Sequence, residues 1–348
     1  MGKNNEQIDF VIPWLDGNDP KWREQMMAAR AECLKTANTF GLGDANDACR
    51  YREMGLLRYW FRGVEKFAPW VNKIYFVTCG QKPEWLDENH PKLVLVDHKD
   101  YIPSDYLPTF NSIPIELNLH RIHSLSEHFV LFNDDVFLIK NVAPDYFFKN
   151  GDPVLPCNLK TYRYYRFDGW SRTCFNNYCV VNQNFNIKKT IWENRRKWFN
   201  IRKLGLKRAL LNIAYYGLNK TTADKDFEHL ATPHLKSTLQ NVWNTCTNVL
   251  EYNSQSRFRT SNDINHWLLC AWNMAQGHFY PVKPGSRGEN INVSRNQIGF
   301  ICDTIKRQRM SLVCLNDTWE NDDPDYCFMQ IRLAFDSILP EASSFEKQ

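Results

Sequence analysis

Short apolar runs along the first 140 residues alternate with longer stretches that have helical spacing. Four of these runs have the length and composition of buried strands, at residues 8–13, 73–78, 93–96 and 129–132. Three stretches between these strands are predicted to be helices: one that starts at residue 21, one at residues 52–67 and one at residues 115–125. Strands that alternate with helices are typical of a doubly wound sheet. The pattern therefore predicts an α/β, Rossmann-like fold.

Polar residues follow each of these strands, and the pair Asp134 and Asp135 follows the run 129–132 directly. Adjacent carboxylates repel one another, so at the end of a buried strand they are costly unless a cation joins them. Open α/β sheets bind their ligands at the carboxyl ends of the strands. The pattern therefore predicts a metal–phosphate site and nucleotide chemistry.

The middle of the chain has a different pattern, since residues 188–208 carry nine Lys or Arg and a single acid, Glu193, among Trp, Ile and Leu. Such a basic amphipathic segment suits a membrane surface or an anionic chain, and it also suits an ordinary solvated helix face. After residue 224 the pattern is globular again, with a helix expected at 264–275 and a strand at 310–315. We expect two halves of one catalytic domain at 1–159 and 223–338, a basic aromatic-rich helical insertion at 160–222 and a tail at 339–348.

Composition narrows the class of protein. The 348 residues are 43% hydrophobic, enough for one large domain or two closely packed ones. A net charge of +4 is far from the signature of a nucleic-acid-binding protein. The 11 Cys are scattered without paired metal spacing, which favours reduced thiols, and no apolar run approaches the roughly 18 residues of a membrane span. We expect a cytoplasmic protein, with peripheral contact to the inner face of the membrane left open.

Three loops that follow predicted strands supply carboxylates: Asp16 and Asp19, the pair Asp134 and Asp135, and Asp317. Carboxylates of this kind suit Mg²⁺ or Mn²⁺, and we predict Asp134, Asp135 and Asp317 as the metal ligands. Two further residues have the chemistry of phosphoryl transfer. Arg259 can fork onto a phosphoryl oxygen, and His234 can act as a general base near neutral pH.

Each candidate also has a local structural explanation. Asp16 and Asp19 lie in a turn-forming sequence, where Asp is common. A single histidine such as His234 is often packed in a core, Arg259 competes with Arg257, and Asp263 can be a helix cap. The glycine-rich phosphate loop of P-loop kinases is absent from the sequence.

Several of these stretches together resemble a known family, the Stealth proteins, which are capsular polysaccharide phosphotransferases related to the GlcNAc-1-phosphotransferase that marks lysosomal enzymes. Residues 8–20 resemble its first conserved region, and a long run between residues 57 and 137 resembles the second. The third is resembled more loosely by residues 232–236 with 259–263, and the fourth by residues 314–317. The basic middle segment is not covered.

The resemblance implies transfer of a hexose 1-phosphate, such as GlcNAc 1-phosphate, from a UDP-sugar to a sugar hydroxyl of a polysaccharide or lipid-linked saccharide, with release of UMP. It also implies a GT-A-like core, similar to that of nucleotide-sugar glycosyltransferases, and Mg²⁺ or Mn²⁺. The family's acids fall on Asp16, Asp134, Asp135 and Asp317, its arginine on Arg259 and its histidine on His234, with His229 as a nearby alternative.

We accordingly predict a catalytic set and a substrate-binding set. The catalytic residues are His234, Arg259, Asp317 and Asp135. The substrate-binding residues are Asp16, Asp19, Arg52, Arg58, Asn111, Asn133 and Asp263. Two rival functions stay open: a metal-dependent glycosyltransferase that releases UDP, and a non-catalytic protein that binds an anionic glycan or a membrane through the basic segment.

Overall fold

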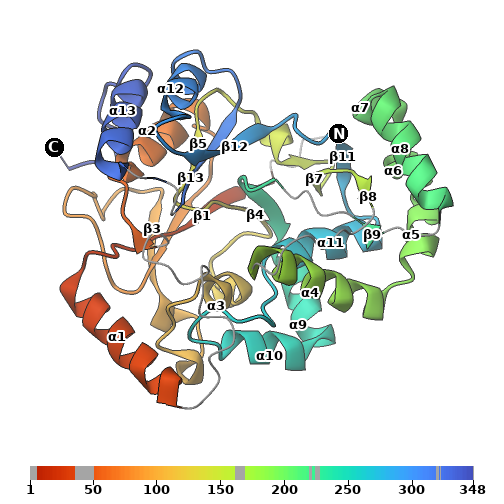
Figure 1. The fold of residues 1–348 in the computed structure, drawn as a ribbon, viewed down its shortest axis with the longest axis horizontal. Helices are drawn as coiled ribbons and strands as arrows, with labels where there is room; N and C mark the ends of the chain where they lie inside the picture. The colour runs from red at the N-terminus through yellow and green to blue at the C-terminus, as the bar shows by residue number, and fades with distance from the viewer. Residues whose placement is uncertain are drawn as a thin grey trace.

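The structure, a computed structural model, describes residues 6–35, 51–160, 169–218, 222–223, 228–318, 321 and 323–347. Its centre is a five-stranded sheet in the order β10-β4-β1-β2-β3 (Figure 1). The strands are β1 (Ile8–Pro13), β2 (Ile74–Thr78), β3 (Leu93–Asp97), β4 (His128–Leu131) and β10 (Thr232–Leu235). The first four are mutually parallel, and β10 runs antiparallel to β4. The prediction of an α/β fold with a Rossmann-like parallel sheet is therefore confirmed.

The central strands β1 and β2 and most of β4 are buried on both faces and are mostly apolar, as expected for parallel strands covered on both sides, whereas the edge strand β3 is partly exposed. Phe10 and Phe132 pack on one face, against α2 (Leu57–Phe67) and a second sheet. That second sheet has the order β12-β13-β5, with bounds β5 (Val136–Leu138), β12 (Gly288–Val293) and β13 (Leu312–Asp317). Val11 and Phe129 pack on the other face, with α3 (Ser112–Leu117), α9 (Lys236–Thr245) and α11 (Trp267–Gln276).

The remaining elements complete the two layers and the periphery. The helices are α1 (Pro20–Lys35), α4 (Gly169–Asn184), α10 (Thr247–Ser254), α12 (Ile298–Lys306) and α13 (Pro324–Asp336). The short strands are β6 (Phe148–Lys149), β7 (Asp152–Pro156), β8 (Leu159–Lys160), β9 (Thr222–Ala223) and β11 (Tyr280–Val282). Among the described residues, no helix combines the length and the apolar character that crossing a bilayer requires.

Three predicted helices begin or end elsewhere. The helix expected at 52–67 is α2, which begins only at Leu57. The helix expected at 115–125 is α3, which ends at Leu117, followed by a short 3₁₀ turn at Leu119–Arg121. The helix expected at 264–275 begins only at Trp267, because the Asp263 carboxylate accepts hydrogen bonds from Thr260 N and Oγ1 and so closes a turn before the helix. Asp263 as a cap of this helix is thus wrong.

The basic segment is broken into four short helices: α5 (Ile187–Glu193), α6 (Arg195–Trp198), α7 (Ile201–Leu204) and α8 (Leu206–Gly217). Asn186 and Asn200 cap α5 and α7 by accepting backbone N–H bonds. Gly205 separates α7 from α8 at a φ of 79°, a conformation that favours glycine. Figure 1 shows α5 to α8 along one edge of the molecule, at the side opposite α1, α2 and α13.

Candidate active site

A recess of about 830 Å³ opens at the carboxyl ends of β1 and β2. Its walls come from the loops that follow these two strands, including Trp14, Asp16 and Trp85. Gln81 joins the two loops, since the backbone N–H of Asp16 donates to its Oε1 at 2.9 Å and its Nε2 donates to the Asp16 carbonyl at 3.2 Å. The recess thus lies where a parallel sheet places its ligands.

Asp16 and Asp19 line this recess and also stabilise local turns. Asp16 Oδ1 accepts the N–H of Asn18 at 2.8 Å. Asp19 Oδ1 accepts the N–H of Trp22 at 2.8 Å, which caps the start of α1. Each of these hydrogen bonds uses only Oδ1 of the carboxylate. The second oxygen can therefore contact a ligand while the first stabilises the turn.

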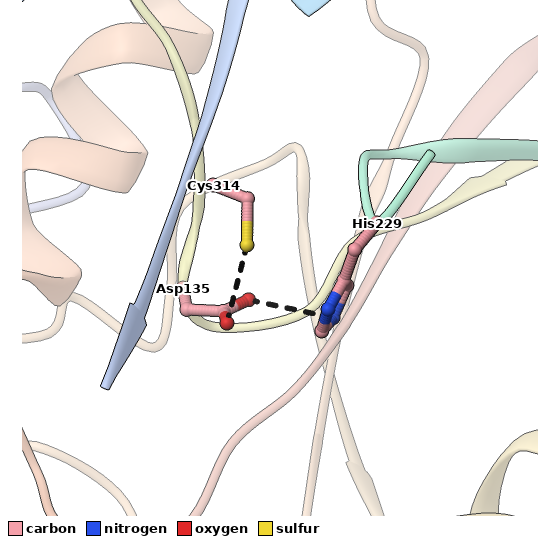
Figure 2. Close-up of side chains that lie close together, drawn as sticks. All are labelled: Asp135, His229 and Cys314. Atoms are coloured by element: carbon pink, nitrogen blue, oxygen red, sulfur yellow. Dashed lines mark hydrogen bonds and ion pairs between the residues drawn. The ribbon is translucent and has the colours of Figure 1, made fainter. Parts of the chain in front are cut away.

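The turn between β4 and β5 carries Asn133, Asp134 and Asp135. Among the described His, Cys, Asp and Glu residues, Asp135, His229 and Cys314 form a cluster with donor atoms within 4.8 Å of one another (Figure 2). His229 Nε2 lies 4.0 Å from Asp135 Oδ1, and Cys314 Sγ donates to Asp135 Oδ2 at 3.4 Å. Figure 2 shows the three side chains converging from the β4–β5 turn, β13 and the segment before β10.

The cluster fits a divalent cation. Asp135 Oδ1 is buried and has no hydrogen-bond partner, which is costly for a carboxylate unless another positive group meets it. Carboxylate oxygens suit Mg²⁺ and Mn²⁺, whereas the imidazole and the thiol favour softer transition metals. Burial, followed by the Asp135 carboxylate, raises the pKa of the Cys314 thiol well above its ordinary value, so this thiol is neutral at pH 7.

Asp134 belongs to a row of acids that extends toward the recess. The side chain is exposed, yet the surrounding protein and then the Asp135 charge raise the pKa of Asp134 to about 7, with a smaller contribution from Glu53. Burial raises the pKa of Glu53 as well, and the negative charge of Asp16 adds to this. Four carboxyl groups thus repel one another along this edge, and such a row favours a cation or a cationic group of a ligand.

Asp317 ends β13 and forms an ion pair with Arg52, with Nη1 2.8 Å from Oδ2. Its other oxygen accepts a hydrogen bond from Asn321 Nδ2 at 2.9 Å. The side chain of Asp317 is 6% exposed and that of Arg52 is 34% exposed. Asp317 is therefore occupied in holding the guanidinium group of a side chain that is partly exposed to solvent.

Two other predicted substrate-binding residues, Arg58 and Asn111, and the predicted catalytic residue Arg259 occupy different positions. Arg58 is exposed at the recess, stacks over Trp85 with its Cζ 5.0 Å from the ring centre, and lies 3.5 Å from Glu346. Asn111 is buried and caps α3 by accepting the N–H of Ile113. Arg259 is half-buried and donates to Ser112 Oγ at 3.2 Å.

The loops that carry Asn111 and Arg259 adjoin the segment that carries Arg52. Phe110 N donates to the Arg257 carbonyl at 2.9 Å, and the Tyr51 hydroxyl donates to the Phe110 carbonyl at 3.1 Å. Phe110 also stacks on Phe258. These contacts bring the loops before α2, before α3 and before α11 together on one side of the site.

His234 lies inside the protein. It is paired with Phe129 across the β4–β10 ladder, is 0% exposed, and neither ring nitrogen has a hydrogen-bond partner. Burial, followed by the nearby His266, lowers the pKa of His234 well below its ordinary value, so the ring is neutral. The structure therefore places His229, the alternative histidine, beside Asp135, whereas His234 is buried within β10.

Two residues of this site were missed in the sequence analysis. Glu53 precedes α2 without any strand before it, and Cys314 was noted only as part of a family stretch. The sequence did contain a signal for Cys314. Side chains two residues apart along a strand lie on the same face, so the strand pattern puts Cys314 on the same face as the polar Asn316. Glu53 had no comparable signal.

Comparisons with known proteins identify the family of this chain. Residues 50–154 match the family model described as Stealth protein CR2, conserved region 2. The chain is 42% identical to the capsular polysaccharide phosphotransferase WcwK of Streptococcus pneumoniae, over 98% of this chain and 99% of that protein. It is 41% identical to the receptor polysaccharide phosphotransferase WefC of Streptococcus gordonii, over 98% and 99%.

A third relative, the exopolysaccharide phosphotransferase cps2G of Lactiplantibacillus plantarum, is 34% identical over 98% of this chain and 96% of its own. Among solved structures, the galactosyltransferase LgtC in complex with donor and acceptor sugar analogs is similar, with a TM-score of 0.40 and 10% identity over 97% of this chain and 98% of that one. That similarity is too distant to carry a conclusion about fold or substrate. The full-length relatives are decisive: this chain belongs to the Stealth family of capsular polysaccharide phosphotransferases.

Proposed function

We propose that this enzyme transfers a hexose 1-phosphate from a UDP-sugar to a hydroxyl of a growing cell-surface saccharide and releases UMP. The observation that carries the proposal is the meeting of His229 and Asp135, whose buried Oδ1 has no hydrogen-bond partner, after the carboxyl end of β4. β4 is the neighbour of β1, at whose carboxyl end the recess opens. A cation-binding carboxylate next to a base is what phosphoryl transfer to a hydroxyl requires.

The recess at β1 and β2 is the donor site in this proposal. Its volume of about 830 Å³ is in the range of pockets that bind small molecules and cofactors. Trp14 and Trp85 in its walls offer aromatic surface for the nucleobase, and the polar loop 16–19 offers hydrogen bonds for the ribose. From there the diphosphate would extend toward Asp134 and Asp135.

Asp134 and Asp135 would hold a divalent cation, Mg²⁺ or Mn²⁺. When bound, this ion neutralises the negative charge of the diphosphate and of the departing UMP. Arg52 would bind a non-bridging oxygen of the transferred phosphoryl group through the side of its guanidinium that Asp317 leaves open. Arg259 stays a candidate for the same charge, since its loop adjoins the segment that carries Arg52.

His229 is the proposed base, in place of His234. The ring is partly exposed and close to Asp135, whereas His234 has no exposed atom through which an acceptor could reach it. In the assigned amide orientation Asn133 Nδ2 donates to His229 Nε2 at 2.7 Å, which orients the ring in the absence of substrate.

The acceptor hydroxyl would give its proton to His229 while its oxygen attacks the β-phosphorus of the donor. A new phosphorus–oxygen bond forms and the bond to UMP breaks, so the bond between C1 of the sugar and its oxygen stays intact. The anomeric configuration of the transferred sugar is therefore retained, and the product is a phosphodiester. Any substrate saccharide, polymeric or lipid-linked, meets this requirement if it presents a free hydroxyl.

The test is incubation of the purified protein with a panel of UDP-sugars, Mg²⁺ and a saccharide acceptor, followed by separation of the nucleotide products. We expect UMP and a phosphorus-containing saccharide. Release of UDP with a neutral glycosidic product would instead establish a glycosyltransferase. The Asp135→Asn variant should lose at least about 100-fold in rate, since removing one electrostatic group from a transfer site costs about that much.

A further inference from the structure

The four helices α5 to α8 expose an unusual number of large apolar side chains. Six of them are between 48% and 62% exposed: Trp192, Ile201, Leu206, Leu210, Ile213 and Leu218. The helices lie together, because α7 packs against α8 and the ring of Trp192 on α5 stacks on that of Tyr216 on α8. They form one edge of the molecule in Figure 1. We call this edge, residues 187–218, the α5–α8 surface.

The apolar side chains of α8 form a stripe. Leu206, Leu210 and Ile213 are four and three residues apart, so they lie on one face of the helix. The opposite face is fixed by the buried Asn212, whose Oδ1 accepts the N–H of Leu159 at 2.9 Å and whose Nδ2 donates to the Trp198 carbonyl at 2.8 Å. Rotating the stripe inward would break both of these buried hydrogen bonds, so its exposure is built into the fold.

Positive charge surrounds the stripe. Residues 187–218 contain nine Lys or Arg and a single acid, Glu193, which lies 3.8 Å from Lys189. Lys197 is paired with Asp152 from outside the segment, at 3.0 Å. Arg196, Arg202 and Lys207 are exposed. Arg195 lies over the face of Trp192, 5.2 Å from the ring centre. Exposed aliphatic side chains with basic residues around them and an aromatic ring at the margin are typical of helices that lie in a lipid–water interface.

We propose that the α5–α8 surface docks on an anionic phospholipid bilayer, with Leu206, Leu210 and Ile213 entering the boundary between headgroups and acyl chains. An anionic polysaccharide would use the basic residues but would leave the aliphatic stripe in water. A second copy of the chain would cover the stripe but would bring two strongly positive surfaces together. An anionic bilayer can bury the aliphatic stripe and pair with the basic residues at the same time.

The proposal concerns a surface outside the candidate active site and does not depend on the chemistry of that site. It explains why a segment so rich in Lys and Arg is also so rich in exposed Leu and Ile. It also gives the enzyme a way to work beside membrane-borne saccharide, while transfer to a water-soluble acceptor needs no docking.

The test is sedimentation of the full chain with vesicles of equal parts phosphatidylglycerol and phosphatidylcholine, compared with vesicles of phosphatidylcholine alone. The matched variants are Leu210→Glu on α8 and Leu333→Glu on α13. Leu210 and Leu333 are both 54% exposed, and both belong to an apolar stripe on a helix, that of α13 being Tyr326, Met329 and Leu333. The charged residues of α13 are Asp325, Arg332 and Asp336, and Arg295, which lies over the Tyr326 ring, is paired with Asp323. The α13 stripe therefore has no excess of basic residues around it.

We expect binding to the anionic vesicles only, weakened by high salt, with at least a tenfold loss for Leu210→Glu and no change for Leu333→Glu. Lys207→Glu should lose at least about fivefold, the value of one basic residue near such a surface. Equal binding to both vesicle types, an equal loss for the two Leu variants, or no binding would overturn the proposal. So would a concentration-dependent dimer that Leu210→Glu dissociates, or retention on an anionic polysaccharide column without vesicle binding.

Discussion

The Asp317 carboxylate holds the Arg52 guanidinium at 2.8 Å across 265 residues of sequence, and it thereby ties the end of β13 to the segment before α2. The partners differ in exposure: the side chain of Asp317 is buried, whereas that of Arg52 is partly exposed. Asp317 therefore has two alternative roles: it can be a metal ligand, or it can position Arg52.

If Asp317 positions Arg52, Asp317→Asn should raise the KM for the UDP-sugar. The loss of a charge-assisted bond of about 1.5–3 kcal/mol corresponds to roughly 10-fold to 100-fold. The Mg²⁺ concentration for half-maximal activity should stay the same. Steady-state kinetics with donor and Mg²⁺ varied in turn measure both quantities. A large rise in the Mg²⁺ requirement would instead assign Asp317 to the metal, as the sequence analysis expects.

The two histidines should respond differently to substitution. His229→Ala should lower kcat by at least about 100-fold, because a positioned base contributes that much, with little change in melting temperature. His234→Leu should keep most of the activity, since an apolar side chain suits a fully buried position. Kinetics and thermal unfolding of both variants give the comparison. Full activity in His229→Ala would return the role of base to His234.

Gly17→Ala should damage the donor site through the backbone. A Cβ at position 17 would lie 1.7 Å from the carbonyl oxygen of Tyr51, so this segment, with Arg52 next in sequence, must shift. We expect a cost of about 1–3 kcal/mol in unfolding free energy and a raised KM for the donor. Gly299→Ala is the control, because it lies in α12 with no atom within 4 Å of the added Cβ, and it should be neutral or stabilising. Equal effects of the two substitutions would contradict the prediction.

Asp134 should lower the folding stability of the metal-free protein as the pH rises. Its pKa in the folded state is raised to about 7 from an ordinary 3.8, so the folded state keeps a proton that the unfolded chain has already lost. The resulting stabilisation is full below pH 3.8 and is lost as the pH rises through about 7. In a metal chelator, Asp134→Asn should therefore gain melting temperature relative to the unmodified protein between pH 4 and pH 8.

With Mg²⁺ at pH 8, the unmodified protein should have a higher melting temperature than Asp134→Asn. The reason is that a bound cation neutralises the ionised carboxylate only where Asp134 is present. Thermal unfolding at several pH values, with chelator and with Mg²⁺, measures both effects. A constant difference between the two proteins across the pH range would show that Asp134 carries no raised pKa.

Much of the fold follows from local patterns in the chain. The apolar run 129–132 and the alternating helices specify a buried parallel sheet, because backbone hydrogen bonding and burial impose a period that the sequence displays. The same reasoning puts Asp134 and Asp135 at the carboxyl end of β4 and Asp16 after β1, as the structure has them. Helix ends were less accurate, since Asp263 closes a turn with Thr260 where a cap was expected.

Which of the two histidines lies beside Asp135 was decided only by tertiary structure. Because β10 runs antiparallel to β4, the segment before β10 meets the carboxyl end of β4, and His229 reaches Asn133 across 96 residues. His234 is two residues inside the strand, where pairing with Phe129 turns its ring into the core. Cys314 likewise meets Asp135 across 179 residues through the pairing of β13 with β5.

The sequence by itself determined the class of fold, the acids at the strand ends and, through family resemblance, the phosphotransferase family. Tertiary structure alone decided which histidine and which thiol join Asp135 and which arginine Asp317 holds. The physical reason is that periodicity and burial are properties of neighbouring residues, whereas strand direction and register are set by the packing of the whole sheet.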